Sequence, residues 1–385
     1  MKLNSLHIKN FRLLEDLQIP ELGRVNLIVG KNNSGKSTVL EALRIYAHVA
    51  YPRLLSLISM EHDENVSLRA SDVDNTSSLD ELPLAHFFTG RSLDPARSIN
   101  MGEVGAINAG LQISFLRNAP RSEPIIRPDG TPDLHQFSPR DYLQIISRKR
   151  SFALDLTAVS DLSQLRDFGR LSHWFAESQI PCSHIPTQLP DLTALAKVWD
   201  SIALTDSQSV VLQSLQSVEP DVENLIFVEK DAGDTDEDPR EARSRRARPR
   251  TAKVKLKGIP RPVPLQSLGD GMLRVLQLAL KAFPAKGGFF LIDEVENGLH
   301  YSVQERIWRQ LFALAEDLDM QIFATTHSWD CIESFAKIAA EKSDTKSVLF
   351  RMGRSIRKSD HGKIIATSFT GEELTAITQA DVEVR

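Results

Sequence analysis

The fold of this chain is decided by one stretch, Asn26-Leu-Ile-Val-Gly-Lys-Asn-Asn-Ser-Gly-Lys-Ser-Thr-Val-Leu-Glu-Ala-Leu43. An apolar run, Val25–Val29, predicts a buried strand, and the residues from Lys36 onward predict a helix. Between them the spacing is G-x-x-x-x-G-K-[ST]. Glycines in such a loop let consecutive N–H groups turn toward one anion, and the helix start adds a positive dipole. The stretch therefore predicts a site for the phosphates of a nucleotide.

Within this phosphate loop we expect each residue type to have its own task. Lys36 is expected to reach the β- and γ-phosphates, and the Ser37 hydroxyl to ligate Mg²⁺. Thr38 stands where its side chain can approach the α-phosphate. The expected nucleotide-binding residues of the loop are Gly30, Asn32, Asn33, Ser34, Gly35, Lys36, Ser37 and Thr38.

A second candidate is the run Gly288-Phe-Phe-Leu-Ile-Asp-Glu294. Four apolar residues followed by two acids predict a buried strand that carries carboxylates at its end. Asp293 is expected to hold Mg²⁺ through water, and Glu294 to polarise the attacking water as general base. An apolar strand that ends in an acidic turn is common, so this run gains its weight from the motifs around it.

Two further motifs surround the carboxylates. Ser267-Leu-Gly-Asp-Gly-Met-Leu-Arg274 runs into an expected helix, Leu273–Phe283, whose Arg274, Gln277 and Lys281 should face away from its apolar stripe. Its Ser267, Gly269 and Gly271 predict a second anion-binding helix start. One nucleotide does not need two such starts in one chain, so we expect two chains, head to tail, to close each other's site. The run Gln321-Ile-Phe-Ala-Thr-Thr-His-Ser328 ends in His327, placed to donate a hydrogen bond to a γ-phosphate.

The order of these motifs resembles the ATP-binding-cassette ATPase head, and more narrowly its soluble RecF/SMC/OLD-like branch. The opening Ile8-Lys-Asn-Phe-Arg12 and the runs Ile292-Asp-Glu-Val-Glu-Asn-Gly-Leu-His300 and Ala324-Thr-Thr-His-Ser328 carry the likeness, which covers about residues 1–50 and 260–335. The resemblance implies an α/β P-loop NTPase of the ABC-ATPase type, with a mixed central sheet flanked by helices and a helical lobe. It also implies ATP and Mg²⁺ as cofactors, and Gln112, on an expected strand, as the glutamine near the metal.

We expect three segments in this architecture. Residues 1–150 would form the N-terminal part of the ATPase head, 151–258 a helical insertion with a flexible charged loop, and 259–385 the C-terminal part of the head. The loop is expected where seven acids in Glu229–Ala242 give way to eight cations in Arg243–Lys257.

Two departures from the family pattern narrow the prediction. Gly269 occupies the position of the usual serine of the signature motif, so the hydroxyl contact to a neighbour's γ-phosphate is in question. The 58 residues after His327 lack a spaced Glu and Asp-x-Asp set, so we expect no Toprim nuclease in this chain. A stand-alone ATPase head remains, similar to the ATPase components of anti-phage defence pairs.

The leading hypothesis is an ATP-hydrolysing homodimer or higher homo-oligomer that controls a separate effector, a nuclease or a toxin. The alternative is a RecF-like repair ATPase that binds DNA, and a transporter subunit is a weaker third reading. Composition bounds all three, because the chain has 385 residues, 46 Lys+Arg against 51 Asp+Glu, and two cysteines. A weakly acidic chain without a run of about 20 apolar residues predicts a cytoplasmic protein with no membrane span and no disulfide framework.

Overall fold

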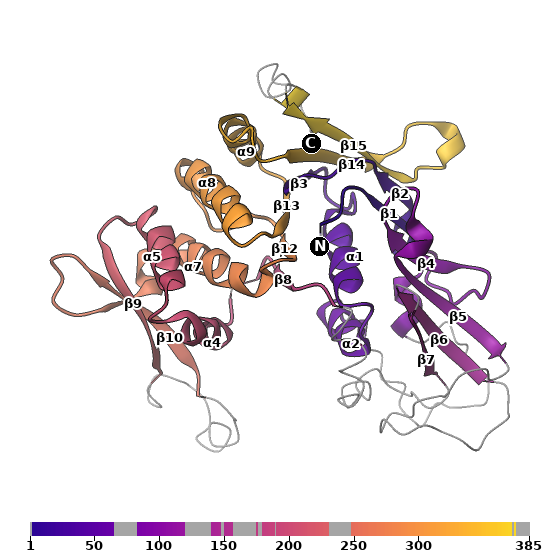
Figure 1. The fold of residues 1–385 in the computed structure, drawn as a ribbon, viewed down its shortest axis with the longest axis horizontal. Coiled ribbons are helices and arrows are strands. Elements are labelled where there is room, and N and C mark those ends of the chain that lie inside the picture. The colour runs from indigo at the N-terminus through magenta and orange to yellow at the C-terminus, as the bar shows by residue number, and fades with distance from the viewer. Residues whose placement is uncertain are drawn as a thin grey trace. The chain divides into compact units, whose positions relative to one another are not determined.

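The computed structural model describes residues 2–64, 83–119, 140–147, 150–156, 175, 179–188, 190–230, 248–371 and 373–374. They form two compact units (Figure 1). The first unit is drawn from Met1–Cys182 and Ser347–Thr370, and the second from Ser183–Lys346. The chain therefore leaves the first unit, builds the second, and returns to complete the first.

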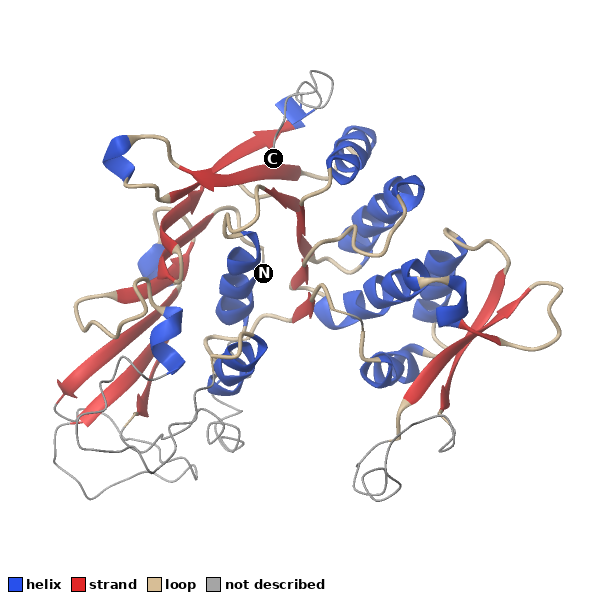
Figure 2. Ribbon diagram, turned by 180° about the vertical axis from the view of Figure 1, so that it is seen from behind, coloured by secondary structure: helices blue, strands red, loops and turns tan. Residues whose placement is uncertain are grey.

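The first unit contains a six-stranded antiparallel sheet in the order β2-β1-β4-β5-β6-β7. Its strands are β1 Leu6–Phe11, β2 Leu14–Ile19, β4 Ser98–Gly102, β5 Leu111–Ala119, β6 Arg140–Ser147 and β7 Arg150–Asp155. Alternate side chains such as Ile8, Ile99 and Ile113 are buried, as period-2 strands with one covered face require. Helices α1 (Lys36–Ala47) and α2 (Pro52–Glu61) lie beside this sheet (Figure 2).

The first unit also contains the strand that precedes the phosphate loop, β3 (Val25–Val29), and this strand belongs to another sheet. All five residues of β3 are buried. β3 pairs in parallel with β14 (Ser347–Arg354), and β14 pairs antiparallel with β15 (Ile364–Thr370), so this sheet is mixed. The sequence predicted β3 and α1, and their strand–loop–helix order is confirmed.

The second unit places two motif-bearing strands side by side. β12 (Phe289–Ile292) and β13 (Gln321–Thr326) are parallel, with Ile292 opposite Ala324, and β8 (Cys182–Ile185) lies on the other side of β12. The helices α8 (Tyr301–Asp317) and α9 (Trp329–Glu341) pack on each other through Trp308 and Phe335. Because parallel strands share an edge, the residues after β12 and after β13 meet there.

A smaller sheet, in the order β11-β10-β9, forms the remainder of the second unit. Its strands are β9 Val222–Glu229, β10 Arg250–Leu256 and β11 Val263–Pro264, and the helices with it are α4 Leu192–Ile202, α5 Asp206–Gln216 and α7 Asp270–Ala282. Short 3₁₀ helices lie at Pro83–Phe87, Ile107–Ala109, Leu265–Leu268, Phe283–Ala285 and Lys358–Asp360.

These elements correct the prediction for residues 151–258. The helical expectation holds for α4 and α5, but the segment also contributes β8, β9 and β10. Arg250–Leu256, expected in a flexible loop, is a strand with alternate residues Ala252, Val254 and Leu256 buried. Lysines alternate with these buried residues, so the sequence was interpreted as a charged loop although its apolar residues have the period of a strand. Residues 231–247 lie outside the described residues.

The α/β class of the fold is as predicted. Every helix in the described part of the chain is too short or too polar to cross a bilayer.

Candidate functional site

The phosphate loop connects β3 to α1 in the first unit, and its two glycines explain its path. Gly35 precedes α1 with φ +93°, a left-handed conformation that favours glycine. A Cβ on Gly30 would lie 2.5 Å from the carbonyl oxygen of Met352 and 2.7 Å from Ser34 Oγ. The start of the loop therefore rests directly on the end of β14, and only glycine allows this approach.

The loop side chains are arranged as a phosphate site requires. Lys36 Nζ donates to the carbonyl oxygens of Gly30 (2.7 Å) and Lys31 (3.1 Å), so its charge lies across the loop. Ser34 Oγ is buried without a hydrogen-bond partner among the described residues. Asn32, Asn33 and Ser37 are exposed, whereas Thr38 is buried. Together, the Lys36 ammonium and a cradle that tolerates no Cβ fit the phosphates of a nucleotide.

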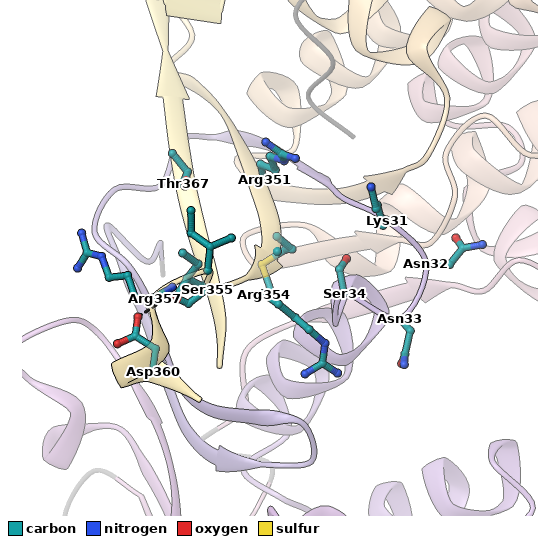
Figure 3. Close-up of a pocket in the computed structure, with 14 residues that line it drawn as sticks. Lys31, Asn32, Asn33, Ser34, Arg351, Arg354, Ser355, Arg357, Asp360 and Thr367 are labelled. Atoms are coloured by element: carbon teal, nitrogen blue, oxygen red, sulfur yellow. Dashed lines mark hydrogen bonds between the residues drawn. The ribbon is translucent and has the colours of Figure 1, made fainter. Parts of the chain in front are cut away.

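A basic cavity of about 790 Å³ flanks this loop. Lys31, Asn32, Asn33 and Ser34 line one side, and residues of the β14–β15 hairpin line the other (Figure 3). The hairpin contribution includes Arg351, Arg354 and Arg357. The sequence reasoning missed this cavity because residues 31–34 and 351–367 are far apart in the chain.

Asp360 keeps this hairpin in shape. Its carboxylate accepts hydrogen bonds from the hydroxyls of Ser355 and Ser359, and these bonds, against the effect of burial, lower its pKa. The Asp360 carboxylate therefore makes its hydrogen bonds within the hairpin.

Gln112 lies in the first unit, on β5. Its amide Nε2 donates to Ser114 Oγ of the same strand (3.3 Å), and it is not among the residues that line the basic cavity. Its role near a metal ion stays a prediction.

In the second unit, the carboxyl ends of β12 and β13 bring the expected catalytic residues together. Asp293 follows β12, and Thr325 of β13 donates from Oγ1 to Asp293 Oδ1 (2.6 Å). The same Oγ1 accepts the backbone N–H of Glu294 (2.8 Å). Thr325 lay inside the quoted Ala324–Ser328 motif, but the sequence did not reveal that it would hold the acidic turn.

Glu294 and His327 are neighbours at this edge. Glu294 has a left-handed φ of +47°, which turns its side chain out of the strand direction. His327 Nδ1 lies 3.5 Å from Glu294 Oε1 and 3.4 Å from Glu296 Oε1, while its backbone N–H donates to Glu296 Oε1 (3.0 Å). The His327 ring is exposed and so accessible to a ligand. The structure thus places Asp293, Glu294 and His327 at one sheet edge, and their expected roles stay predictions.

The glycine-rich motif forms the start of α7. Gly269 has φ +97° and a Cβ there would meet no atom within 4 Å, so its backbone is open to solvent. Ser267 is exposed, and its hydroxyl donates to the carbonyl oxygen of Pro264 (2.6 Å). Gly271 packs closely, because a Cβ would lie 3.0 Å from the carbonyl oxygen of Gly298.

One prediction for α7 is wrong. Arg274 and Gln277 were expected to face away from the apolar stripe, but they are only 5% and 3% exposed. Arg274 Nη2 donates to the carbonyl oxygens of Asp293 (2.7 Å) and Glu294 (2.8 Å). The period of apolar residues along a helix assigns every polar residue to the exposed face. It therefore could not reveal that Arg274 is buried and bonds to main-chain carbonyls.

Comparisons with known families agree with this geometry. A model described as "AAA ATPase domain" matches residues 1–158, which hold the phosphate loop. A model described as "AAA domain, putative AbiEii toxin, Type IV TA system" matches residues 201–330, which hold the glycine-rich, carboxylate and histidine motifs. The protein is an ATP-binding and ATP-hydrolysing P-loop ATPase, and the predicted resemblance is confirmed.

Individual relatives are more distant. The chain is 24% identical to an "ATP/GTP phosphatase" of Helicobacter pylori, covering 97% of this chain and 96% of the relative. It is 44% identical to the "OLD nuclease" of Thermus scotoductus over 54 residues, which are 14% of this chain and 10% of the nuclease. A solved SMC head bound to the C-winged helix domain of ScpA aligns with 98% of this chain and 100% of its own, at 13% identity and a TM-score of 0.47.

Proposed function

We propose that the protein dimerises head to tail on ATP and thereby controls a separate effector, a nuclease or a toxin. In this proposal the phosphate loop of one copy binds ATP, and the start of α7 of another copy covers the γ-phosphate. Hydrolysis removes the group that both copies bind, so ATP favours the closed form and ADP does not.

The observation that carries the proposal is the exposed, glycine-rich start of α7. The first N–H groups of a helix have no partner within the helix, so they can bind an anion. Gly269 has no side chain, and no atom of the described residues lies within 4 Å of the position that its Cβ would take, so the backbone at this helix start is accessible. Because Gly269 replaces the usual serine, the backbone and the exposed Ser267 hydroxyl would make the contact.

We propose that Mg²⁺ is held by Ser37 and, through water, by Asp293. A hydroxyl and a carboxylate are hard oxygen ligands, which Mg²⁺ prefers. Glu294 would take a proton from the attacking water, and His327 would donate a hydrogen bond to the γ-phosphate. Thr325 supports this role of Asp293, because its Oγ1 donates a hydrogen bond to Asp293 Oδ1 and so orients the carboxylate.

A role in anti-phage defence is part of the proposal. The description of the model that matches residues 201–330 names a toxin and a toxin–antitoxin system. This description supports an ATPase that works beside an effector.

The test uses Glu294→Gln, which keeps the shape of the side chain but removes the base. Hydrolysis should fall by roughly 10²–10⁴-fold while ATP still binds. Light scattering should then show a larger mass with ATP than with ADP or no nucleotide. The matched variant adds Ser267→Arg, which puts a bulky cation on an exposed position without a packing conflict. It should bind ATP but stay small. A Glu294→Gln protein of equal mass in all three conditions would contradict ATP-driven assembly.

A second candidate function, binding of nucleic acid, is favoured by the basic cavity. Residues 351–363 contain five cations, Arg351, Arg354, Arg357, Lys358 and Lys363, and one acid, in a chain whose net charge is -5. The acid, Asp360, is held by two hydroxyls within the hairpin. Such a local concentration of positive charge can contact successive phosphates of a nucleic-acid backbone.

Salt dependence separates this candidate from the first. If the hairpin contacts phosphates, Arg354→Glu/Arg357→Glu should weaken duplex binding and reduce the slope of log K against log salt by about 2. The charge-matched control, Arg53→Glu/Arg97→Glu on other exposed positions of the unit, should leave the slope unchanged. Equal slopes in all three proteins would exclude the hairpin as a nucleic-acid surface.

A further inference from the structure

We infer that Arg274 is a positioning residue of the ATPase reaction, whose guanidinium holds the backbone on both sides of Glu294 and so fixes the direction of its carboxylate. The inference rests on the proposed role of Glu294 as general base. It concerns residues of the second unit alone.

The contacts of Arg274 are directed at the acidic turn. Nη2 donates to the carbonyl oxygens of two successive residues, Asp293 (2.7 Å) and Glu294 (2.8 Å). Nη1 donates to the carbonyl oxygen of Pro186 (3.0 Å) and to Gln277 Oε1 (3.0 Å). A planar guanidinium can meet this set of acceptors in one orientation, whereas an ammonium on a flexible stem cannot.

A charge buried for packing alone would be a poor choice at this position. Burial lowers the pKa of Arg274 to about 10, while the nearby charges of Glu296, Asp293 and Glu294 oppose that shift. The guanidinium thus has three carboxylates near it, and Arg274 holds the backbone of two of these residues, Asp293 and Glu294. An apolar residue of the same size would avoid the desolvation cost, so the guanidinium is explained by what it binds.

The turn itself needs such support. Glu294 adopts φ +47°, which a residue with a side chain takes up only at a cost. On one side, Thr325 fixes the turn, because its Oγ1 accepts the N–H of Glu294 and its carbonyl accepts the N–H of Val295 (3.0 Å). On the other side, Arg274 holds the carbonyls of the peptides before and after the Glu294 Cα. With both peptides held, the Cα–Cβ bond of Glu294 has one direction.

The experiment is a double-mutant cycle between Arg274 and Glu294. Arg274→Met should lower kcat by about 10²-fold, because a misplaced catalytic group costs this much, and should change the Kd for ATP by less than about threefold. In the Glu294→Gln background the same substitution should lower kcat by less than about threefold, since no base is left to position. Arg274→Lys should recover little activity, because one ammonium cannot hold both carbonyls.

The matched control is Arg250→Met. Arg250 is also an arginine of the second unit with several acceptors, since it donates to Asp200 and to the carbonyl oxygen of Phe227. Its loss should lower the unfolding temperature without lowering kcat. A merely structural role for Arg274 would give the same result as this control.

The outcomes of the cycle show whether Arg274 positions Glu294. Unchanged kcat in Arg274→Met, or losses that multiply fully in the double variant, would overturn the inference. If Arg274→Met does not fold, the cycle is run with Arg274→Lys under the same criterion. If Glu294→Gln itself leaves kcat unchanged, the proposed role of Glu294 fails instead, and the two failures are thus distinguished.

Discussion

Substitution of Gly30 by alanine tests the contact between the phosphate loop and β14. A Cβ at this position would lie 2.5 Å from the Met352 carbonyl oxygen, whereas real Cβ contacts essentially never fall below 3.0 Å. The loop or β14 must therefore move by at least about 0.5 Å, and Met352 is held in register opposite Ala366 of β15. Overpacking costs about 1–3 kcal/mol, and the φ of +149° adds at least about 1 kcal/mol for a residue with a side chain.

The sum, about 2–4 kcal/mol, corresponds to a loss of roughly 5–15 °C in unfolding temperature for a unit of about 200 residues. A displaced loop should also lose at least one charge-assisted hydrogen bond to ATP, which is about 10–150-fold in Kd. Calorimetry and titration with a fluorescent ATP analogue measure the two effects. Gly353→Ala is the control on β14, because a Cβ there meets no atom within 4 Å. If Gly30→Ala matched Gly353→Ala in both measurements, the described approach of loop and strand would be refuted.

Other expected outcomes concern single side chains. Lys36→Ala should raise the Kd for ATP about 10–150-fold because its ammonium no longer reaches the phosphates, whereas Lys31→Ala should change it by less than about threefold; equal effects in a titration would contradict the assignment. The hydrogen bond that the His62 ring donates to the Glu41 carboxylate raises the pKa of His62 above 6.5. The pair therefore stabilises the fold below that pH, and the contribution is lost as pH rises through the raised pKa. His62→Gln should therefore lower the unfolding temperature more at pH 6 than at pH 9, and an equal loss at both would argue against the pair. Burial raises the pKa of Cys182 to about 12 and also raises that of Cys331. At pH 8 the buried Cys331 thiol should react with a disulfide reagent only after unfolding, as absorbance of the released thiolate would show.

The sequence was informative where chemistry and local structure coincide. A phosphate loop has to follow a buried strand and precede a helix, so β3 and α1 could be placed from their residues alone. The acids after β12 and His327 after β13 were also found, because apolar strands with polar ends are visible in the residue order. The meeting of these residues follows from the parallel pairing of β12 and β13, which the structure shows and the sequence analysis did not predict.

What could not be predicted depends on contacts between distant residues. Nothing in residues 347–354 indicates that β14 lies beside β3 and supports Gly30. Arg274 has the polarity of a surface residue, and its acceptors are main-chain carbonyls, which every residue has. In β10 the lysines at 253 and 255 matched a solvated loop as well as an exposed strand face. Each of these features is set by tertiary pairing, which local patterns do not encode.

The position of β14 has a consequence for the newly made chain. The ribosome completes β14 about 320 residues after β3, and at roughly 5–20 residues per second that is a delay of about 15–60 s. For most of this interval the emerging polypeptide contains Gly30-to-Ser37 but neither the carboxylates after β12 nor His327, and the start of the loop has no strand to rest on. A product released after His327 but before β14 would carry every motif without the strand that supports the first of them.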